Sequence, residues 1–281
     1  MPAPHVMLIT GASSGLGRSL VEAALAKGDI VVATLRKPKA LDDLKSKYSS
    51  DRLLVLPLDV TKSEEVKAVF AEAKETFGRL DAVFNNAGTF IVGELEYTSE
   101  DQARALFETN FFGAISVTRE AVALFREQGS GGHLFQITSS NVSKPPAGTS
   151  VYSASKAALE TLSDALRDEL DPAWGIKVTN VKLSGTRTSL FDKGTAPARN
   201  DLYSNPALPQ NQMFALIQSG KFPLADSDKA AKALLDKLDL PKEERPHRLL
   251  LGAYALDCAR ERASILTELV EHDEAVALSV M

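Results

Sequence analysis

Short apolar runs alternate with longer amphipathic segments along most of the chain. Runs such as HVMLIT and IVVATL are apolar at successive positions, which is typical of strands buried on both faces. The segments between them repeat their apolar positions at helical spacing and often end at a glycine or before a proline. The pattern predicts strands at 5–10, 30–35, 52–60, 80–88, 133–140, 176–183 and 247–253. It predicts helices at 16–28, 40–48, 63–78, 100–128, 151–170 and 254–279.

Strands that are apolar on both faces and separated by helices predict a parallel sheet covered on both sides. Right-handed crossovers then give a doubly wound, Rossmann-like α/β fold with a seven-stranded, mainly parallel sheet. We expect a single domain over 1–281, with a substrate loop or lid at 189–225 and a helical extension at 254–281. The irregular stretch 189–213 follows the sixth predicted strand, so it can reach the carboxyl edge of the sheet, where ligands bind in such folds.

Composition and charge argue against several classes of protein. The 281 residues are 44% hydrophobic and 25% charged, which is typical of a soluble globular protein. A net charge of −5 without a dense Lys/Arg run argues against nucleic acid or an anionic membrane as partner. The single cysteine, Cys258, cannot form an intramolecular disulfide. The apolar run near the N-terminus is interpreted as a core strand and not as a signal peptide, and no apolar stretch approaches the roughly 18 residues of a membrane span. We therefore expect a cytoplasmic protein.

The first predicted strand and the first predicted helix are joined by a glycine turn, TGASSGLG, at 10–17. Gly11 allows a tight exit from the strand, Gly15 lets a phosphate approach the backbone, and Gly17 permits close packing of helix on strand. A helix that begins there directs free N–H groups and its positive dipole end at an anion. Glycines that serve only a tight turn are the alternative, but the position between strand and helix favours a dinucleotide phosphate site.

Further motifs follow the glycine turn in order. LDV at 58–60 ends the third predicted strand, and NNAG at 85–88 ends the fourth. NFFG begins at Asn110, Ser139 lies at the end of the fifth strand, and Tyr152 and Lys156 form a YxxxK pair. These motifs follow one another along the chain in this order. With the TGxxxGxG spacing, the chain resembles the short-chain dehydrogenase/reductase family, in its shorter, single-domain branch, from residue 5 to about 188. The ATLR run and the extended C-terminus resemble its carbonyl reductase and hydroxysteroid dehydrogenase members.

The resemblance implies hydride transfer between a nicotinamide cofactor and a carbonyl or alcohol, with Asn110, Ser139, Tyr152 and Lys156 as the catalytic residues. Tyr152 and Lys156 are four residues apart, so they share a helix face. A free tyrosine has a pKa near ~10, and a nearby ammonium lowers it, so we expect Lys156 to lower the pKa of Tyr152. By resemblance, Lys156 also holds the nicotinamide ribose, Ser139 holds the substrate oxygen, and Asn110 completes a water-linked proton relay. Counting without gaps from the motifs on either side favours Ser139 over its neighbour Ser140.

The end of the second predicted strand indicates which nicotinamide cofactor binds. NAD-binding units carry an acidic residue there, but here Leu35 takes that place and Arg36 follows, which suits the 2′-phosphate of NADP. A solvated loop charge is the alternative for Arg36. We expect NADP(H), with additional hydroxyl contacts from Ser13 and Ser14. The glycine turn and the resemblance together assign to the cofactor Gly11, Ser13, Ser14, Gly15, Leu16, Gly17, Arg36, Asp59, Val60, Asn86, Ala87, Gly88, Tyr152, Lys156, Leu183, Thr186 and Thr188.

One segment departs from the family pattern. After the sixth strand the family has Pro-Gly and then Thr, whereas this chain reads LSGTRT at 183–188. Leu183 and Ser184 thus replace Pro-Gly in the segment that wraps the nicotinamide amide, which leaves the details of that contact open. The change does not affect the predicted fold.

The substrate is expected to be an apolar ketone, aldehyde or secondary alcohol, because apolar residues stand where the pocket mouth is expected. They are Phe90, Ile91, Val92, Pro145, Pro146, Phe191, Tyr203, Met213 and Phe214, and ordinary core or lid packing is the alternative for each. The four histidines are scattered and no His/Cys/Asp cluster has metal-ligand spacing, so we expect no metal.

Two other functions and the assembly state complete the expectations. There are two alternatives to a reductase. One is a non-catalytic NADP(H) sensor on the same fold, and the other is an epimerase or dehydratase of the longer family branch. In relatives, helices equivalent to 100–128 and 151–170 pair subunits, so the resemblance implies a homo-oligomer, a dimer or a tetramer. The helix at 254–279 carries an apolar stripe, which covers the core or contacts a subunit.

Overall fold

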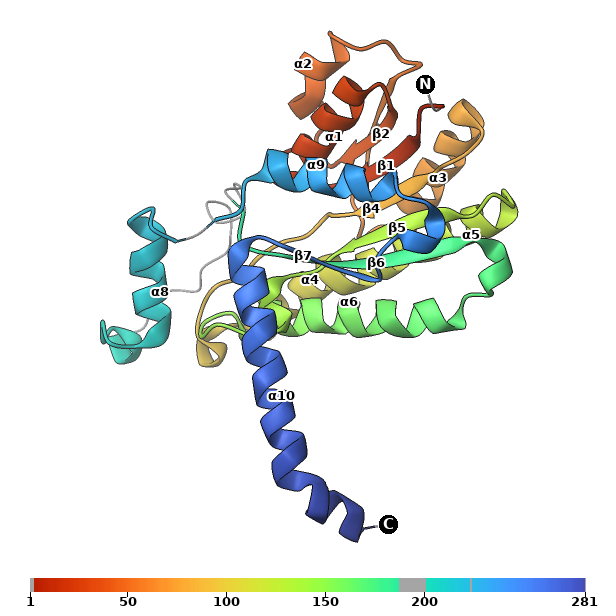
Figure 1. The fold of residues 1–281 in the computed structure, drawn as a ribbon. Helices are drawn as coiled ribbons and strands as arrows, with labels where there is room; N and C mark the ends of the chain where they lie inside the picture. The colour runs from red at the N-terminus through yellow and green to blue at the C-terminus, as the bar shows by residue number, and fades with distance from the viewer. Residues whose placement is uncertain (1–2, 187–200, 223, 281) are drawn as a thin grey trace.

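The computed structural model describes residues 3–186, 201–222 and 224–280. Seven strands form one sheet in the order β3-β2-β1-β4-β5-β6-β7, and every neighbouring pair is parallel (Figure 1). The predicted doubly wound α/β fold is therefore confirmed. The strands are β1 Val6–Thr10, β2 Ile30–Leu35, β3 Leu53–Pro57, β4 Ala82–Asn85, β5 Gly132–Ile137, β6 Ile176–Leu183 and β7 Arg248–Leu251.

Helices cover both faces of the sheet. They are α1 Gly15–Lys27, α2 Asp42–Lys45, α3 Ser63–Phe77, α4 Glu100–Phe107, α5 Ala114–Glu127, α6 Ser150–Glu169, α8 Pro209–Gln218, α9 Ser227–Leu238 and α10 Ala253–Ser279. Successive residues of β1 serve the two faces in turn: Met7 and Ile9 pack with α1 and α9, and Val6 and Leu8 pack with α3 and α5. Period-two alternation between two apolar layers explains why this strand is apolar throughout.

The predicted helix 100–128 is interrupted. α4 and α5 are separated by a π-helical turn at Glu108–Gly113, which carries Asn110. A side chain at Gly113 would approach Cγ2 of Val60 to 2.8 Å, so this turn packs tightly on the loop after β3. Hydrophobic periodicity does not reveal a π turn, because the extra residue shifts the helical face by only a fraction of a turn.

Other predicted elements are shorter than expected or differ in kind. β3 ends at Pro57 and β4 at Asn85, so Leu58 to Val60 and Asn86 to Gly88 lie in loops. The predicted helix 40–48 is a 3₁₀ turn, Pro38–Leu41, followed by one turn of α2. The described part of the irregular stretch is partly helical, since α8 begins at Pro209, the residue type that favours a helix's first turn.

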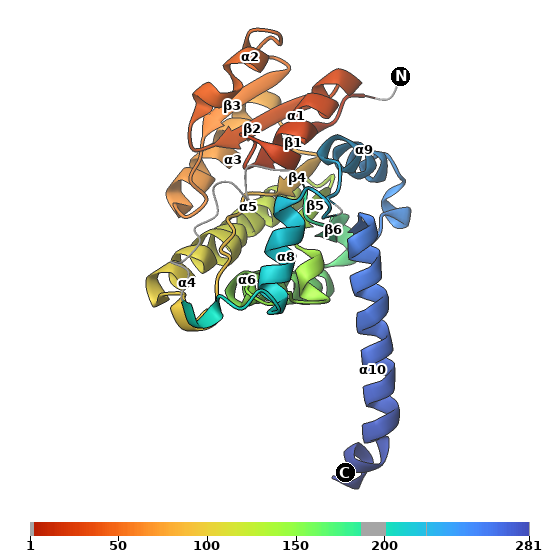
Figure 2. The same cartoon turned by 90° about the vertical axis from the view of Figure 1, so that its left-hand side faces the viewer.

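Two helices extend from the sheet region. α8 lies beside the carboxyl edge of the sheet, and α10 runs from the end of β7 away from the body of the molecule (Figures 1 and 2). Only the first turns of α10 are packed: Ala255 and Cys258 are buried, and every residue from 260 to 280 is exposed. The expectation that this helix covers the core therefore holds only for its start.

Candidate functional site

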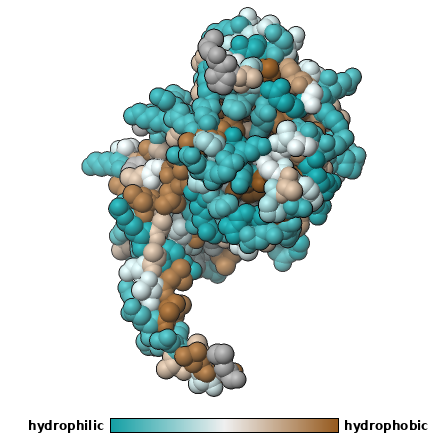
Figure 3. Space-filling model, turned by 45° about the vertical axis from the view of Figure 1, so that its right-hand side comes forward, coloured by the Kyte–Doolittle hydropathy of each residue, from teal (hydrophilic) through white to brown (hydrophobic). Residues whose placement is uncertain are grey.

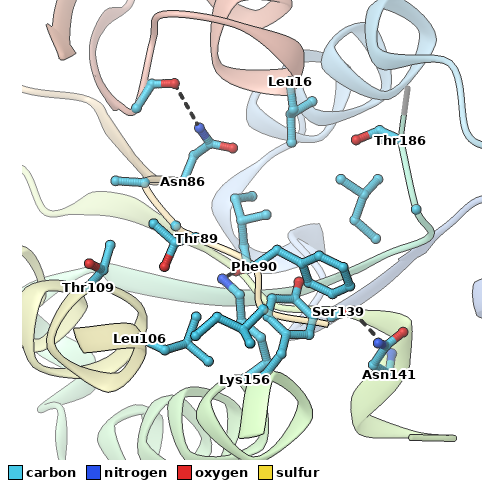
Figure 4. Close-up of a pocket in the computed structure, with 18 of the residues that line it drawn as sticks. Leu16, Asn86, Thr89, Phe90, Leu106, Thr109, Ser139, Asn141, Lys156 and Thr186 are labelled. Atoms are coloured by element: carbon cyan, nitrogen blue, oxygen red, sulfur yellow. Dashed lines mark hydrogen bonds between the residues drawn. The ribbon is translucent and has the colours of Figure 1, made fainter. Parts of the chain in front are cut away.

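A cavity of about 660 Å³ opens at the carboxyl ends of β1, β2, β4, β5 and β6. It includes the point where the strand order reverses between β1 and β4, where ligands bind in doubly wound folds. Figure 4 shows side chains that line this cavity. Most of the predicted cofactor and catalytic residues line it: Gly11, Ser13, Ser14, Leu16, Arg36, Asp59, Val60, Asn86, Ala87, Gly88, Ser139, Tyr152, Lys156, Leu183 and Thr186. Gly15, Gly17 and Asn110 do not line it, and Thr188 lies outside the described residues.

The glycine turn has the geometry of an anion site. Gly11 and Gly15 have φ angles of 69° and 55°, in the left-handed region that glycine adopts without strain. α1 begins at Gly15, directly after Ser14, and its first turn contains no acidic residue. Its free N–H groups and its dipole thus face the cavity with no carboxylate on that turn to repel an anion.

Gly17 brings α1 close to the strand ends. A Cβ atom at Gly17 would overlap the carbonyl oxygen of Gly11 and lie 2.7 Å from Nδ2 of Asn86. Asn86 Nδ2 donates to the Thr10 carbonyl at 2.8 Å, and Thr10 Oγ1 accepts from the backbone N–H groups of Asn86 and Ala87 at 3.0 and 2.9 Å. The NNAG segment and the glycine turn are therefore one hydrogen-bonded unit. Sequence reasoning missed Thr10, although it is the residue just before Gly11.

Arg36 and Asp59 lie at the end of the cavity formed by the loops after β2 and β3. Leu35 is buried and Arg36 is exposed, so the side chain that follows β2 at the cavity is a guanidinium. Asp59 Oδ1 accepts from the backbone N–H and the hydroxyl of Thr61 at 3.1 and 2.8 Å, which holds this carboxylate in its own turn. This end of the cavity thus presents an exposed cation beside a fixed carboxylate.

Ser139 and Tyr152 meet at the far end of the cavity. Tyr152 is buried, hydrogen-bonded to Ser139, and its ring stands edge-on to Phe90 with centroids 4.6 Å apart. Ser139 Oγ also accepts from the backbone N–H of Asn141 at 3.2 Å, the contact drawn in Figure 4. Ser140 is buried without lining the cavity, so the geometry favours Ser139 as the residue that faces a ligand.

Lys156 lies one helical turn after Tyr152, and its Nζ donates to the carbonyl oxygen of Ile137 at 2.8 Å. Burial lowers the pKa of Lys156 to about 8. Burial also raises the pKa of Tyr152, against the opposing effect of the hydrogen bond with Ser139. The expectation that Lys156 lowers the pKa of Tyr152 is therefore wrong for this structure, because desolvation of the phenolate dominates.

Asn110 is held by the π turn between α4 and α5. Its Oδ1 accepts from the backbone N–H of Thr89 at 2.8 Å, and its Nδ2 donates to the Thr89 carbonyl at 3.0 Å and to Ser155 Oγ at 3.1 Å. A Cβ atom at Gly88 would lie 3.2 Å from Asn110 Oδ1 and 3.5 Å from Lys156 Nζ, so both polar groups converge on this glycine. Sequence reasoning missed Ser155. The feature of the sequence that could have indicated it is a small polar residue directly before the lysine, on the helix that also carries the tyrosine.

The departure at Leu183 and Ser184 has a structural role. Ser184 Oγ accepts from the backbone N–H of Ala255, in the first turn of α10, at 2.9 Å. Leu183 and Thr186 line the cavity, and Thr186 forms an isolated parallel bridge with Ala225. The residues that replace Pro-Gly thus connect the cavity wall to the start of the C-terminal helix.

The cavity wall around Tyr152 is mainly apolar. Of the residues expected there, Phe90, Ile91, Val92, Pro146, Met213 and Phe214 line the cavity, Pro145 does not, and Phe191 lies outside the described residues. Tyr203 does not line it either; its hydroxyl donates to Glu96 Oε2 at 2.9 Å. Sequence reasoning missed Leu106, Ile217, Phe222 and Tyr254, which also line it. Tyr254 comes from α10 and stands edge-on to Phe222.

A membrane-spanning helix and a metal site are both absent from the described residues. No helix among residues 3–186, 201–222 and 224–280 is long and apolar enough to cross a membrane. No group of three or more His, Cys, Asp or Glu side chains in the described part of the chain is arranged to hold a metal ion.

Comparisons with known proteins agree with the fold and the motifs. The family model for short chain dehydrogenases matches residues 5–198. An uncharacterised oxidoreductase of Schizosaccharomyces pombe is 36% identical over 278 residues, 98% of this chain and 91% of the relative. A short-chain dehydrogenase from Streptomyces avermitilis is 39% identical, with a TM-score of 0.88 and full coverage of both chains.

A more distant structure is a short chain dehydrogenase/reductase from Burkholderia phymatum in complex with NAD. It is 24% identical to this chain, the match covers 95% of each chain, and the TM-score is 0.80. At this identity the likeness shows the fold alone. The matched family model and the two closer relatives establish that this chain belongs to the short-chain dehydrogenase family, as an oxidoreductase with a nucleotide-binding fold.

Proposed function

We propose that the protein is an NADP(H)-dependent oxidoreductase that interconverts an apolar ketone or aldehyde and the corresponding alcohol. The observation that carries this proposal is the convergence of Ser139, Tyr152 and Lys156 in one cavity with the glycine turn and Arg36. Asn110 approaches Lys156 from behind, across Gly88. Bound along this cavity, NADPH supplies the hydride for the reduction.

The glycine turn fits the pyrophosphate of such a cofactor. The start of α1 provides backbone N–H donors, and Gly11 and Gly17 leave room that a side chain would fill. Arg36 is proposed to pair with the 2′-phosphate, because a guanidinium forms strong charge-assisted hydrogen bonds to phosphate and Leu35 leaves no acid for a 2′-hydroxyl. The NAD complex of the Burkholderia phymatum protein is too distant to decide between the two cofactors.

Tyr152 is proposed as the acid–base group. Because burial raises its pKa, Tyr152 is held in the protonated form, which is the form that donates a proton to the substrate oxygen in reduction. Ser139 is proposed to hold the same oxygen and to steady its developing charge. Lys156, with a pKa of about 8, can exchange a proton near neutral pH, and Asn110 is proposed to complete the path that returns the proton to Tyr152.

The substrate class follows from the wall around Tyr152. Phe90, Ile91, Leu106, Met213 and Phe214 surround this end of the cavity. Among the described lining residues, the charged side chains are Arg36, Asp59 and Lys156, which are assigned above to the cofactor or to catalysis. An uncharged, apolar carbonyl compound fits such a wall, because it would leave no buried charge without a partner.

The test measures NADPH and NADH oxidation with a panel of aromatic, aliphatic and steroid-like ketones. We expect turnover with NADPH to be much faster than with NADH. Tyr152→Phe should abolish turnover and retain NADPH binding, whereas Tyr48→Phe, outside the cavity, should retain both. Full activity of Tyr152→Phe would refute the role of this tyrosine, and tight NADPH binding without turnover of any substrate would favour a non-catalytic sensor.

Cofactor choice is tested separately. Arg36→Asp should raise the KM for NADPH at least about tenfold, because a charge-assisted hydrogen bond contributes roughly 1.5–3 kcal/mol and the new carboxylate repels phosphate. Lys45→Asp makes the same charge change away from the cavity and should leave the KM unchanged. An unchanged preference in Arg36→Asp would exclude Arg36 from cofactor recognition. The homo-oligomer and the cytoplasmic location stay predictions.

A further inference from the structure

The outer part of α10 stands clear of the rest of the chain (Figures 1 and 2). The last contact that ties it to the body is the ion pair between Lys144 and Glu261, at 2.6 Å. From there to Ser279, the hydrogen bonds and ion pairs found in the described residues lie within the helix itself. This outer part is roughly 27 Å long at 1.5 Å per residue. A single helix of that length is only marginally stable in water without a packing partner.

The outer part carries an apolar stripe on one side. Placed at 100° per residue, its large apolar side chains except Leu278 fall within roughly 140° of arc. They are Ile265, Leu266, Leu269, Val270, Val276 and Val280, and each is between 44% and 83% exposed. Ala255 and Cys258, which are buried against the body, lie on the same side. The apolar face that attaches α10 to the body thus continues beyond it without a partner among the described residues. Figure 3 shows hydrophobic side chains along the protruding helix.

Charge divides α10 into two halves. Before the centre of the stripe, Arg260 and Arg262 stand with two carboxylates, Asp257, which pairs with Arg260, and Glu261, which pairs with Lys144. After the centre, the helix has no Lys or Arg and carries four carboxylates, at Glu268, Glu271, Asp273 and Glu274. Carboxylates near the C-terminal end of a helix are opposed by its dipole, so nearby cations would stabilise them. A second copy of α10 that runs in the opposite direction supplies such cations, whereas a parallel copy would place acid beside acid. The acidic half also disfavours an anionic membrane surface as the occupant of the stripe.

We propose that α10 pairs antiparallel with α10 of a second copy of this chain, through the stripe. The two arginines and the four carboxylates of the second half lie on either side of a midpoint close to Leu266, which is therefore near the two-fold axis of the pair. Ile265, Leu269, His272 and Val276 recur at intervals of four, three and four residues, the spacing of a two-helix seam. This surface is distinct from α4, α5 and α6, the helices in the ranges 100–128 and 151–170 that the family resemblance assigns to subunit pairing.

Disulfide cross-linking of the full-length protein tests the pairing and its direction. Ile265 lies on the seam next to the two-fold axis and faces its own copy, so Ile265→Cys should form a cross-linked dimer under mild oxidation. In an antiparallel pair the two copies of Val276 are roughly 30 Å apart, so Val276→Cys should not cross-link. The native Cys258 is buried, and the unmodified protein is the control.

The two cross-linking positions separate the possible results. Cross-linking at Ile265→Cys alone supports the proposal, and cross-linking at Val276→Cys would show a parallel pair and refute it. Absence of cross-linking at both positions would also refute it. Binding to anionic vesicles without self-association would assign the stripe to a membrane instead.

Sedimentation velocity provides a second test that needs no engineered cysteine. Leu269→Glu places a charge in the stripe and should weaken self-association at least tenfold. Leu278→Glu makes the same substitution on the opposite side of the helix and should leave self-association unchanged. Both residues are exposed in the single chain, so both variants should fold, which circular dichroism checks. Equal self-association of the two variants and the unmodified protein would refute the proposal.

Discussion

Replacing Lys156 by methionine is expected to stabilise the fold while it removes activity. The ammonium of Lys156 is buried, and burial lowers its pKa from 10.5 to about 8. That difference corresponds to about 3 kcal/mol at pH 7, where both the folded and the unfolded chain carry the charge. Methionine has a similar length and no charge, so it avoids this cost. It also loses the hydrogen bond to the Ile137 carbonyl, which contributes about 1 kcal/mol, so the net gain is about 2 kcal/mol.

The direction in which the free energy of unfolding changes with pH distinguishes the burial of the Lys156 ammonium from other causes of a stability difference. Between about pH 8 and 10.5 the folded protein has released the lysine proton and the unfolded chain still holds it. The unfolded state therefore binds more protons, and the stability of the unmodified protein rises with pH across this window. Lys156→Met lacks this titration, so its advantage should shrink above pH 8 and vanish by about pH 10.

Urea unfolding at 25 °C measures the effect. With a slope of about 3 kcal/mol per molar for a chain of this size, the midpoint of Lys156→Met should rise by about 0.7 M at pH 7. Lys229→Met, at an exposed position on α9, should change the free energy of unfolding by less than about 0.5 kcal/mol. A Lys156→Met protein that is no more stable at pH 7, or whose advantage is the same at pH 10, would refute the reasoning.

The remaining predictions concern a buried histidine and the start of α10. Burial lowers the pKa of His133 well below its ordinary 6.5, with smaller contributions from the charges of Arg245 and Lys177. Below pH 6.5 the unfolded chain thus gains a proton that the folded protein does not. This group should therefore lower the free energy of unfolding by up to about 1.4 kcal/mol for each pH unit below 6.5. In His133→Gln, the free energy of unfolding should depend less on pH between pH 6.5 and 5. Ser184→Ala should destabilise the first turn of α10 by about 1 kcal/mol, seen as faster hydrogen exchange at Ala255, and unchanged exchange there would contradict the capping role.

The features predicted correctly depend on local requirements. The turn at 10–17 needs residues without side chains at particular positions, and the overlap that a Cβ atom at Gly17 would make explains why glycine stands there. The parallel, doubly wound sheet follows from apolar runs separated by helices, together with the handedness of the crossovers. The site could be located from the sequence for the same reason: its residues follow strands whose carboxyl ends meet at one edge of the sheet.

The features missed depend on contacts between distant segments. Whether burial or a neighbouring ammonium controls the pKa of Tyr152 depends on the packing of Phe90 and Ser139 around it, which spacing along one helix does not reveal. The π turn that holds Asn110 depends on Val60, fifty residues before it, and on Ser155, forty-five residues after it. Tyr254 lines the cavity because α10 begins beside it, although the residue is about a hundred positions from the tyrosine at 152.

The departure from the family pattern at Ser184 is explained by the same long-range packing. α10 begins at Ala253, and the residue before it, Gly252, has a φ of 99° and no side chain to cap the helix. A Cβ atom at Gly252 would overlap Ser184 Oγ, so the glycine makes room for the hydroxyl that caps the helix in its place. A glycine at position 184 would remove that cap. The cavity wall after β6 and the start of α10 are therefore coupled, because Ser184 lines the cavity and its hydroxyl caps the C-terminal helix.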